Sequence, residues 1–160
     1  MKKFSRKYGH MPGLFDKVVR ELTLYQLVGS GSESSVYALR ENSAVVAAVT
    51  FLTSVSEARR KKAVLDEIEM CQLEGIIPRR FDTVIYSHGA RDGVMLVTLW
   101  ERLNIISWRG WHNVYASAMH LAEALFAGLA AMHESGICHR DISPNNVVLT
   151  PQGVRFLDMQ

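Results

Sequence analysis

Short apolar runs rich in valine, leucine and aromatic residues occupy much of the first hundred positions, and such runs predict β-strands. The predicted strands are Leu22–Val28, Ser35–Arg40, Ala44–Leu52, Val84–Ser87 and Val94–Trp100. The last two are joined through a turn that contains Asp92 and Gly93. This half of the chain is therefore expected to form an antiparallel sheet.

Helical spacing replaces this pattern after the third strand. In Glu57–Leu73 the apolar residues Val64, Ile68 and Cys71 recur at i, i+4 and i+7, so they share one face of a predicted helix. Five antiparallel strands with one helix after the third are expected to make a small lobe.

The second half of the chain is dominated by its longest helical segment, Asn113–Glu134, which Gly136 is expected to end. Leu121, Leu125 and Leu129 recur on one face of this segment. Two short apolar runs follow and predict a hairpin, namely Val147–Leu149 and Val154–Leu157. The expected fold class is α+β.

Composition and charge narrow the functional classes. The 160 residues are 48% hydrophobic and 21% charged, which is ordinary for one domain with a core. A net charge of +2 is too small to argue for a nucleic-acid partner. The basic residues Lys2, Lys3, Arg6 and Lys7 cluster in a segment, residues 1–21, that is read as a solvated tail. Contact of this cluster with a membrane surface or a polyanion is the alternative.

The pattern predicts no membrane span, because the longest apolar run, around Ala44 to Val49, is far too short. No apolar run follows the basic residues as in a signal peptide. The two cysteines, Cys71 and Cys138, imply no disulfide framework. A cytoplasmic or nuclear location is expected.

A glycine-rich loop lies between the first two predicted strands, in Gly29-Ser30-Gly31-Ser32-Glu33-Ser34-Ser35-Val36. Glycines let a backbone approach phosphates closely, although a glycine-serine hairpin without a ligand is the alternative. A dinucleotide-binding loop of similar pattern needs a helix after it, whereas a strand follows here. Glu33 is unexpected at the tip, because a carboxylate there would repel phosphate.

The most informative stretch is the run from His139 to Asn146, followed by an apolar hairpin and then Asp158. Asp141 and Asn146 are five residues apart, and Asp158 ends the hairpin. Three oxygen-donating side chains in this order are what phosphoryl transfer needs: one orients a hydroxyl, and two hold Mg²⁺.

This stretch closely resembles the catalytic loop and metal-binding Asp of the eukaryotic-type protein kinases. Its Ser143 and Pro144 resemble some fungal-type and atypical members. The resemblance implies that Asp141 is the catalytic base and that Asn146 shares the catalytic site and binds Mg²⁺ together with Asp158. ATP and Mg²⁺ are the implied cofactors, with a protein as substrate or partner.

The resemblance also implies a nucleotide site, formed by Gly29, Gly31, Val36, Ala48, Glu67, Thr98, Leu99 and Trp100. Val36 would pack on the base and Thr98 would lie at the back of the pocket. The backbones of Leu99 and Trp100 would face adenine, although Trp100 is equally an ordinary packing residue.

Ser143 stands where Ser/Thr kinases usually carry a Lys that contacts the γ-phosphate, and two further places depart from the kinase pattern. The third strand of kinases carries Val-Ala-x-Lys, whose Lys binds phosphates and pairs with a helix Glu. Aligning Ala48 with the kinase Ala places Thr50 at the Lys position, and a shift of one residue places Val49 there. Glu67 then has no Lys partner and is equally a solvated carboxylate, while Lys61 or Lys62 could supply a relocated cation.

The second departure follows Asp158, where Met159 and Gln160 replace Phe and Gly. Met can fill an apolar site as Phe does, but Gln lacks the backbone freedom of Gly.

The resemblance covers the first part of a kinase domain, with a small lobe at residues 22–100 and a partial large lobe at 101–160. The later helices, which would cover the leucine face of Asn113–Glu134, are not in this sequence, so self-association is expected. The expected function is ATP- and Mg²⁺-dependent phosphoryl transfer to a Ser or Thr hydroxyl of a protein. The alternative is a pseudokinase or kinase fragment that acts by binding a partner.

Overall fold

The computed structural model describes residues 12–31, 33–87 and 93–159, which divide into two compact units. The first unit contains the described residues up to Ala63 together with Arg80–Arg102. The second contains Val64–Arg79 and the described residues from Leu103 onward. Each unit has a hydrophobic core of its own. The basic cluster that begins at Lys2 lies outside the described residues.

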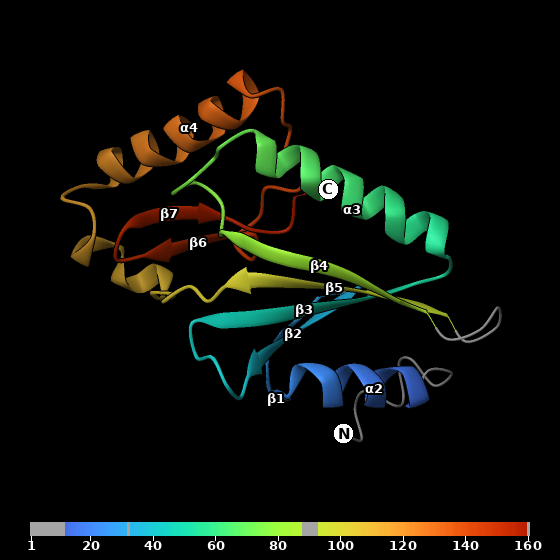
Figure 1. Ribbon diagram of the computed structural model, residues 1–160. Helices are drawn as coiled ribbons and strands as arrows, with labels where there is room; N and C mark the ends of the chain where they lie inside the picture. Colours follow the sequence, from blue (N-terminus) through green and yellow to red (C-terminus); the bar gives the residue numbers. More distant parts are fainter. Residues whose placement is uncertain (1–11, 32, 88–92, 160) are drawn as a thin grey trace. The chain divides into compact units, whose positions relative to one another are not determined.

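The first unit is built on a five-stranded antiparallel sheet in the order β1-β2-β3-β5-β4 (Figure 1). Its strands are β1 (Leu24–Ser30), β2 (Ser34–Leu39), β3 (Val45–Leu52), β4 (Arg80–Ser87) and β5 (Val94–Glu101). The predicted five-stranded antiparallel sheet is therefore confirmed. The predicted turn residue Asp92 lies outside the described residues.

Helix α2 (Pro12–Leu22) supplies part of the first core. Its Leu14 and Val18 are buried against residues of the sheet that include Val49 and Val97. The prediction that residues 1–21 form a solvated basic tail is therefore wrong for the stretch that forms this helix. Leu14, Val18 and Leu22 do recur at i, i+4 and i+8. A helix this short is stable only when its apolar face packs against another element, and the spacing does not show which element that is.

Helix α3 (Val55–Met70) begins in the first unit and ends in the second. The hydroxyl of Ser54 accepts a hydrogen bond from the Glu57 N–H at 3.1 Å. The Glu57 carboxylate in turn accepts from the Thr53 N–H at 3.0 Å and from the Thr53 hydroxyl at 2.9 Å. These bonds, with the backbone N–H foremost, hold the pKa of Glu57 below its ordinary value. The pattern resembles a capping box and explains why the helix starts here.

The end of α3 differs from the prediction, which continued the helix to Leu73. Gln72 has a φ of 50°, which a helix cannot accommodate. Leu73 lies beyond the helix and is buried in the core of the second unit.

The second unit packs helix α4 (Ala118–Glu134) against a two-stranded hairpin, β6 (Val147–Thr150) and β7 (Gly153–Phe156). A 3₁₀ helix, η1 (Trp108–Asn113), precedes α4. Met132, Leu149 and Phe156 are fully buried at the centre of its core.

Helix α4 starts at Ala118, five residues after the predicted start at Asn113. Ser117 caps it, because its hydroxyl accepts a hydrogen bond from the His120 N–H at 3.2 Å. The residues before the cap form the separate 3₁₀ helix, so this bound of the predicted helix is wrong.

The leucine face of α4 also corrects a prediction. Leu121, Leu125 and Leu129 were expected to lie open to water, but all three are partly buried against the core of the second unit. Large apolar side chains are instead exposed elsewhere on the helix, with Met119 at 67% and Phe126 at 71%. The β6–β7 hairpin thus supplies a partner for the leucines within this chain.

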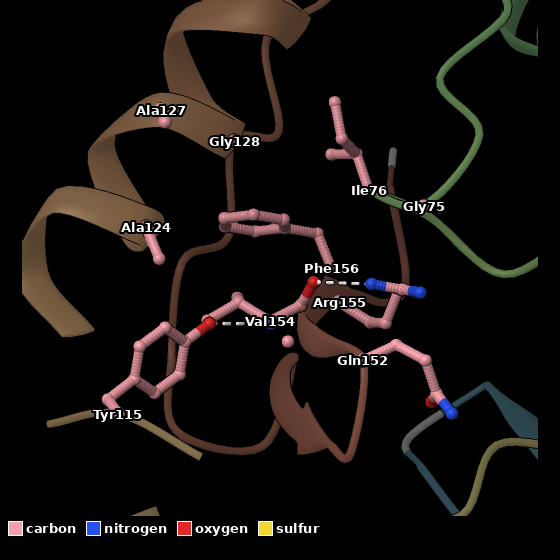
Figure 2. Close-up of a pocket in the computed structure, with 11 residues that line it drawn as sticks. Gly75, Ile76, Tyr115, Ala124, Ala127, Gly128, Gln152, Val154, Arg155 and Phe156 are labelled. Atoms are coloured by element: carbon pink, nitrogen blue, oxygen red, sulfur yellow. Dashed lines mark hydrogen bonds between the residues drawn. The ribbon is translucent and has the colours of Figure 1, made fainter. Parts of the chain in front are cut away.

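Close packing between α4 and the hairpin depends on Gly128. A Cβ atom at this position would lie 2.6 Å from the ring of Phe156. Figure 2 shows the Phe156 ring beside Gly128. Both residues, together with Tyr115, border a pocket with a volume of about 330 Å³. The Tyr115 hydroxyl accepts a hydrogen bond from the Val154 N–H at 3.1 Å, which connects the segment before α4 to the hairpin.

In the described part of the chain, no helix combines the length and the apolar character needed to cross a membrane.

Candidate active site

The glycine-rich loop is the connection between β1 and β2. Gly29 lies opposite Val36, and Ser30 lies opposite Ser35, so the two strands are paired up to the loop. The Gly31 N–H donates to the Ser34 carbonyl at 2.8 Å and closes the turn. Ser32 lies outside the described residues.

The fold of this loop does not itself require glycine. A Cβ atom on Gly29 would be 4.0 Å from the Val36 Cβ, and one on Gly31 would be 3.9 Å from Ser34 atoms, both ordinary contacts. Neither glycine is among the described residues with positive φ. Alanine would therefore fit at both positions, so any need for glycine here would come from something outside the loop.

Three residues of the predicted nucleotide site lie side by side across the sheet. Val36 of β2 is directly opposite Ala48 of β3, and Ala48 is directly opposite Thr98 of β5. Directly opposite residues in antiparallel strands share a face. Thr98 is buried, and its hydroxyl accepts a hydrogen bond from the Thr83 hydroxyl at 3.5 Å. The sheet thus brings Val36, Ala48 and Thr98 onto one face, which we call the Ala48 face.

The same register places Thr50 and Val49 on opposite faces of the sheet. Thr50 is two residues after Ala48, so it lies on the Ala48 face, opposite Ser34 of β2. Val49 lies on the other face and is fully buried in the first core. Of the two positions, only Thr50 shares a face with Ala48, and neither carries a cation.

Leu99 and Trp100 lie inside β5 and are paired on both sides. Leu99 is opposite Ala47 of β3 and Asp82 of β4, and Trp100 pairs with the same two strands. Their backbones are therefore part of the sheet, and the predicted contact with adenine stays a prediction. Glu67 is exposed and belongs to the second unit, whereas Thr50 belongs to the first.

One contact at the glycine-rich loop was not predicted. The ammonium group of Lys61, on α3, is 2.6 Å from the carboxylate of Glu33, which lies in the loop. The sequence showed an unexpected acid at Glu33 and a possible cation at Lys61, but only the tertiary structure pairs them.

Asp141 and Asn146 are held together by their side chains. The Asn146 amide nitrogen donates to the Asp141 carboxylate at 2.7 Å and to the Asp141 carbonyl at 3.0 Å. Both bonds use the nitrogen of the amide, and its oxygen is the kind of ligand that Mg²⁺ prefers. The five-residue spacing thus closes into one loop in which the two predicted catalytic residues touch.

Asp158 is brought to the same end of the hairpin by the backbone. Val147 pairs with Phe156 at the end of the ladder, and the next bond runs from the Leu157 N–H to the Asn146 carbonyl at 2.7 Å. Asp158 follows directly, is exposed, and has a φ of 60°, a left-handed conformation that Asp tolerates better than most residues.

His139 is buried beneath the Asp141 loop and contacts it through a hydrogen bond. Its ring is 2% exposed and meets the ring of Phe156 edge-on, with centroids 6.0 Å apart. Its Nδ1 accepts a hydrogen bond from the Asp141 N–H at 3.4 Å, whereas its buried Nε2 has no partner among the described residues. The next residue, Arg140, has a φ of 65°. The packing of His139 therefore helps to set the position of Asp141.

Asn146 and Asp158 suit a metal that arrives with its substrate. Among the described residues, no group of three or more His, Cys, Asp or Glu could hold a metal ion. Mg²⁺ in phosphoryl-transfer sites needs only one or two protein oxygen ligands, since phosphates and water complete its shell. The donor set therefore fits Mg²⁺ bound together with a nucleotide.

The pocket of Figure 2 contains none of the predicted site residues. Its lining is mainly apolar, with Arg155 as its one charged residue, and it holds no carboxylate, imidazole or thiol ligand for a metal. The chemistry needed for phosphoryl transfer lies at the Asp141 loop instead.

Comparison with protein families matches residues 22–159 to the protein kinase domain. The chain belongs to the protein kinase family. The five-stranded sheet agrees with this membership, and the Asp141 loop and Asp158 fall within the matched residues.

Individual kinases match over shorter stretches. The chain is 50% identical over 38 residues to the putative cyclin-dependent kinase F-2 of Oryza sativa subsp. japonica, covering 24% of the chain and 12% of that kinase. It is 33% identical over 73 residues to the serine/threonine-protein kinase PTK1/STK1 of Saccharomyces cerevisiae, covering 45% of the chain and 11% of that kinase. The probable serine/threonine-protein kinase PkwA of Thermomonospora curvata is 50% identical over 38 residues, covering 24% of the chain and 5% of its own length. The matches thus span about a tenth or less of these kinases.

Proposed function

We propose that this chain binds ATP together with Mg²⁺ and takes part in phosphoryl transfer to a Ser or Thr hydroxyl of a protein. Asp141 accepts the hydroxyl proton, while Asn146 and Asp158 hold Mg²⁺ on the phosphates. Gly29, Gly31 and the Ala48 face hold the nucleotide. Membership of the protein kinase family supports the reaction class.

One observation supports the proposal above the others. Asn146 donates directly to the Asp141 carboxylate at 2.7 Å, and the backbone bond from the Leu157 N–H to the Asn146 carbonyl, also 2.7 Å, places Asp158 one residue further along the same end of the hairpin. An acid and two metal ligands at one end of one hairpin form the minimal set for this chemistry.

The proposed step is an in-line transfer. The substrate oxygen forms a bond to the γ-phosphorus as the bond from this phosphorus to the β-bridging oxygen breaks. ADP leaves with that electron pair, and the hydroxyl proton passes to the carboxylate of Asp141. Bound Mg²⁺ would neutralise charge on the phosphates. The Asn146 amide keeps the Asp141 carboxylate oriented through the bond to its Oδ2.

The choice of a Ser or Thr acceptor has two supports. The run from Ser143 to Pro144 favours it, and two of the relatives above are named serine/threonine-protein kinases.

Thermal melting with and without Mg-ATP tests nucleotide binding, because a ligand that binds only the folded state raises the melting temperature. We expect a rise at millimolar Mg-ATP that is reduced with ATP and EDTA, since EDTA removes the metal. Asp158→Asn and Asn146→Ala should reduce the rise. Asp16→Asn and Asn145→Ala are matched controls at exposed positions and should not. A folded sample that shows no rise with Mg-ATP would refute the proposal.

A second function is favoured by Thr50. With no cation at this position on the Ala48 face, the chain would be a pseudokinase or kinase fragment that acts by binding a partner protein. An assay with γ-labelled ATP separates the two functions. Label transfer to protein that is lost on Asp141→Asn supports catalysis. Mg-ATP binding without any transfer supports the second function.

A further inference from the structure

Strand β3 offers no cation to a bound phosphate. None of its residues, Val45–Leu52, is basic, and Thr50 stands at the position on the Ala48 face where the kinase pattern has Lys. Phosphoryl transfer depends on positive charge near the phosphates, so a kinase-type site in this chain needs its cation from another element.

The first unit places a lysine beside the glycine-rich loop. Lys61 is on α3, and its ammonium group is 2.6 Å from the carboxylate of Glu33 in the glycine-rich loop. The backbone of Glu33 adjoins β3, because the Phe51 N–H donates to the Glu33 carbonyl at 3.5 Å. Phe51 is the residue after Thr50, and Thr50 is itself opposite Ser34, the residue after Glu33. The residue that holds the cation therefore has its backbone at the junction of the loop and β3.

We propose that Lys61 supplies the phosphate-binding cation of this chain, and that Glu33 holds it there until a nucleotide binds. This proposal rests on the proposed nucleotide site. On binding, the ammonium group moves from the Glu33 carboxylate to a phosphate oxygen of ATP. The pair explains how Glu33 is tolerated at the tip of a phosphate-binding loop, because Lys61 neutralises the charge of its carboxylate.

The exchange is feasible because the pair is exposed. The side chains of Lys61 and Glu33 are 41% and 68% exposed, and exposed ion pairs contribute little to stability. A lysine ammonium on a four-carbon stem can turn to a new partner without moving the helix. A phosphate carries more charge than a carboxylate, so the exchange favours the nucleotide.

Lys61→Met tests this proposal, with Lys62→Met as the matched control that removes the same charge from the next residue. Affinities for Mg-ATP and for adenosine are measured by NMR titration, which also reads millimolar binding. We expect Lys61→Met to weaken Mg-ATP about tenfold, the effect of one charge-assisted hydrogen bond. Adenosine has no phosphate, so its affinity should change less than about twofold. Lys62→Met should change both less than about twofold.

Glu33→Gln separates a phosphate ligand from a mere neutraliser of Glu33. The single change should tighten Mg-ATP a few-fold, because Lys61 no longer has to leave a carboxylate. If Lys61 touches phosphate, Lys61→Met still weakens binding about tenfold in the Glu33→Gln background. If Lys61 only offsets the charge of Glu33, its replacement has no effect in that background.

The outcomes are distinct. No binding of Mg-ATP by the unaltered chain refutes the proposed function and this inference with it. Mg-ATP binding that Lys61→Met and Lys62→Met weaken equally refutes the role of Lys61 alone. So does a loss of adenosine binding equal to the loss of ATP binding, or the disappearance of the Lys61 effect when Glu33 is Gln.

Discussion

Phe156→Ala should remove much of the free energy of unfolding of the second unit. The Phe156 ring is 1% exposed and packs between α4 and His139. Truncating a buried Phe to Ala costs about 3–5 kcal/mol, through lost burial and the cavity left behind. Whole domains are stable by about 5–15 kcal/mol, so this one change removes a large share.

Phe126→Ala is the matched control, because it makes the same substitution on an exposed residue. Phe126 is 71% exposed on α4. It therefore loses less than about 1 kcal/mol of burial. The higher helix propensity of Ala returns about 0.5 kcal/mol, so the net change is close to zero.

Urea denaturation followed by tryptophan fluorescence measures both variants. Trp108 and Trp111 pack against the core that contains Phe156, so their emission reports on this unit. With a slope of about 2 kcal/mol per molar urea, Phe156→Ala should lower the midpoint by about 1.5–2.5 M. Phe126→Ala should leave it almost unchanged. Equal effects of the two changes would refute the packing of α4 against the hairpin.

Three further predictions concern the first unit. Thr50→Lys should raise the affinity for Mg-ATP and the rate of any phosphoryl transfer by about tenfold or more. Val49→Lys buries a charge in the core and should instead unfold the unit. Equal responses of the two variants would contradict the register of β3. Gly31→Ala should leave the urea midpoint unchanged or slightly higher, since no atom blocks a Cβ at this position. The same change should weaken the binding of Mg-ATP. An unchanged affinity for ATP would count against a phosphate-binding loop. Burial, together with a hydrogen bond to Glu21, raises the pKa of Tyr86 from its ordinary value of 10.0 to about 12, so the folded state favours the protonated phenol. The stabilisation that the protonated phenol contributes is complete below pH 10 and is lost as the pH rises towards 12. In urea titrations at alkaline pH, Tyr86→Phe should reduce this loss of stability. The same change at the exposed Tyr25 should not.

Local signals in the sequence were enough for much of the fold. The strand runs, the helix between β3 and β4, and the β6–β7 hairpin were predicted because their apolar patterns and turns act over a few residues. The set of Asp141, Asn146 and Asp158 was likewise readable, because all three lie on one loop and one hairpin. Kinase membership followed from the same stretch.

Helix boundaries and helix partners needed more than local pattern. The start of α4 depends on the Ser117 cap, a single side-chain hydrogen bond that competes with continued helix. Helix α2 is stabilised by the sheet against which Leu14 and Val18 are buried. The leucine face of α4 has a partner in this chain because the hairpin folds against it, which periodicity alone cannot reveal.

The sequence by itself determined which residues could serve phosphoryl transfer, and only the tertiary structure decided where their charges lie. Pairing register decided that Thr50, and not Val49, shares the Ala48 face, because one residue of slip moves a side chain to the opposite side of a sheet. The contact between Lys61 and Glu33 joins residues 28 positions apart. Such a contact follows from how α3 and the glycine-rich loop fold, and no spacing in the sequence encodes it.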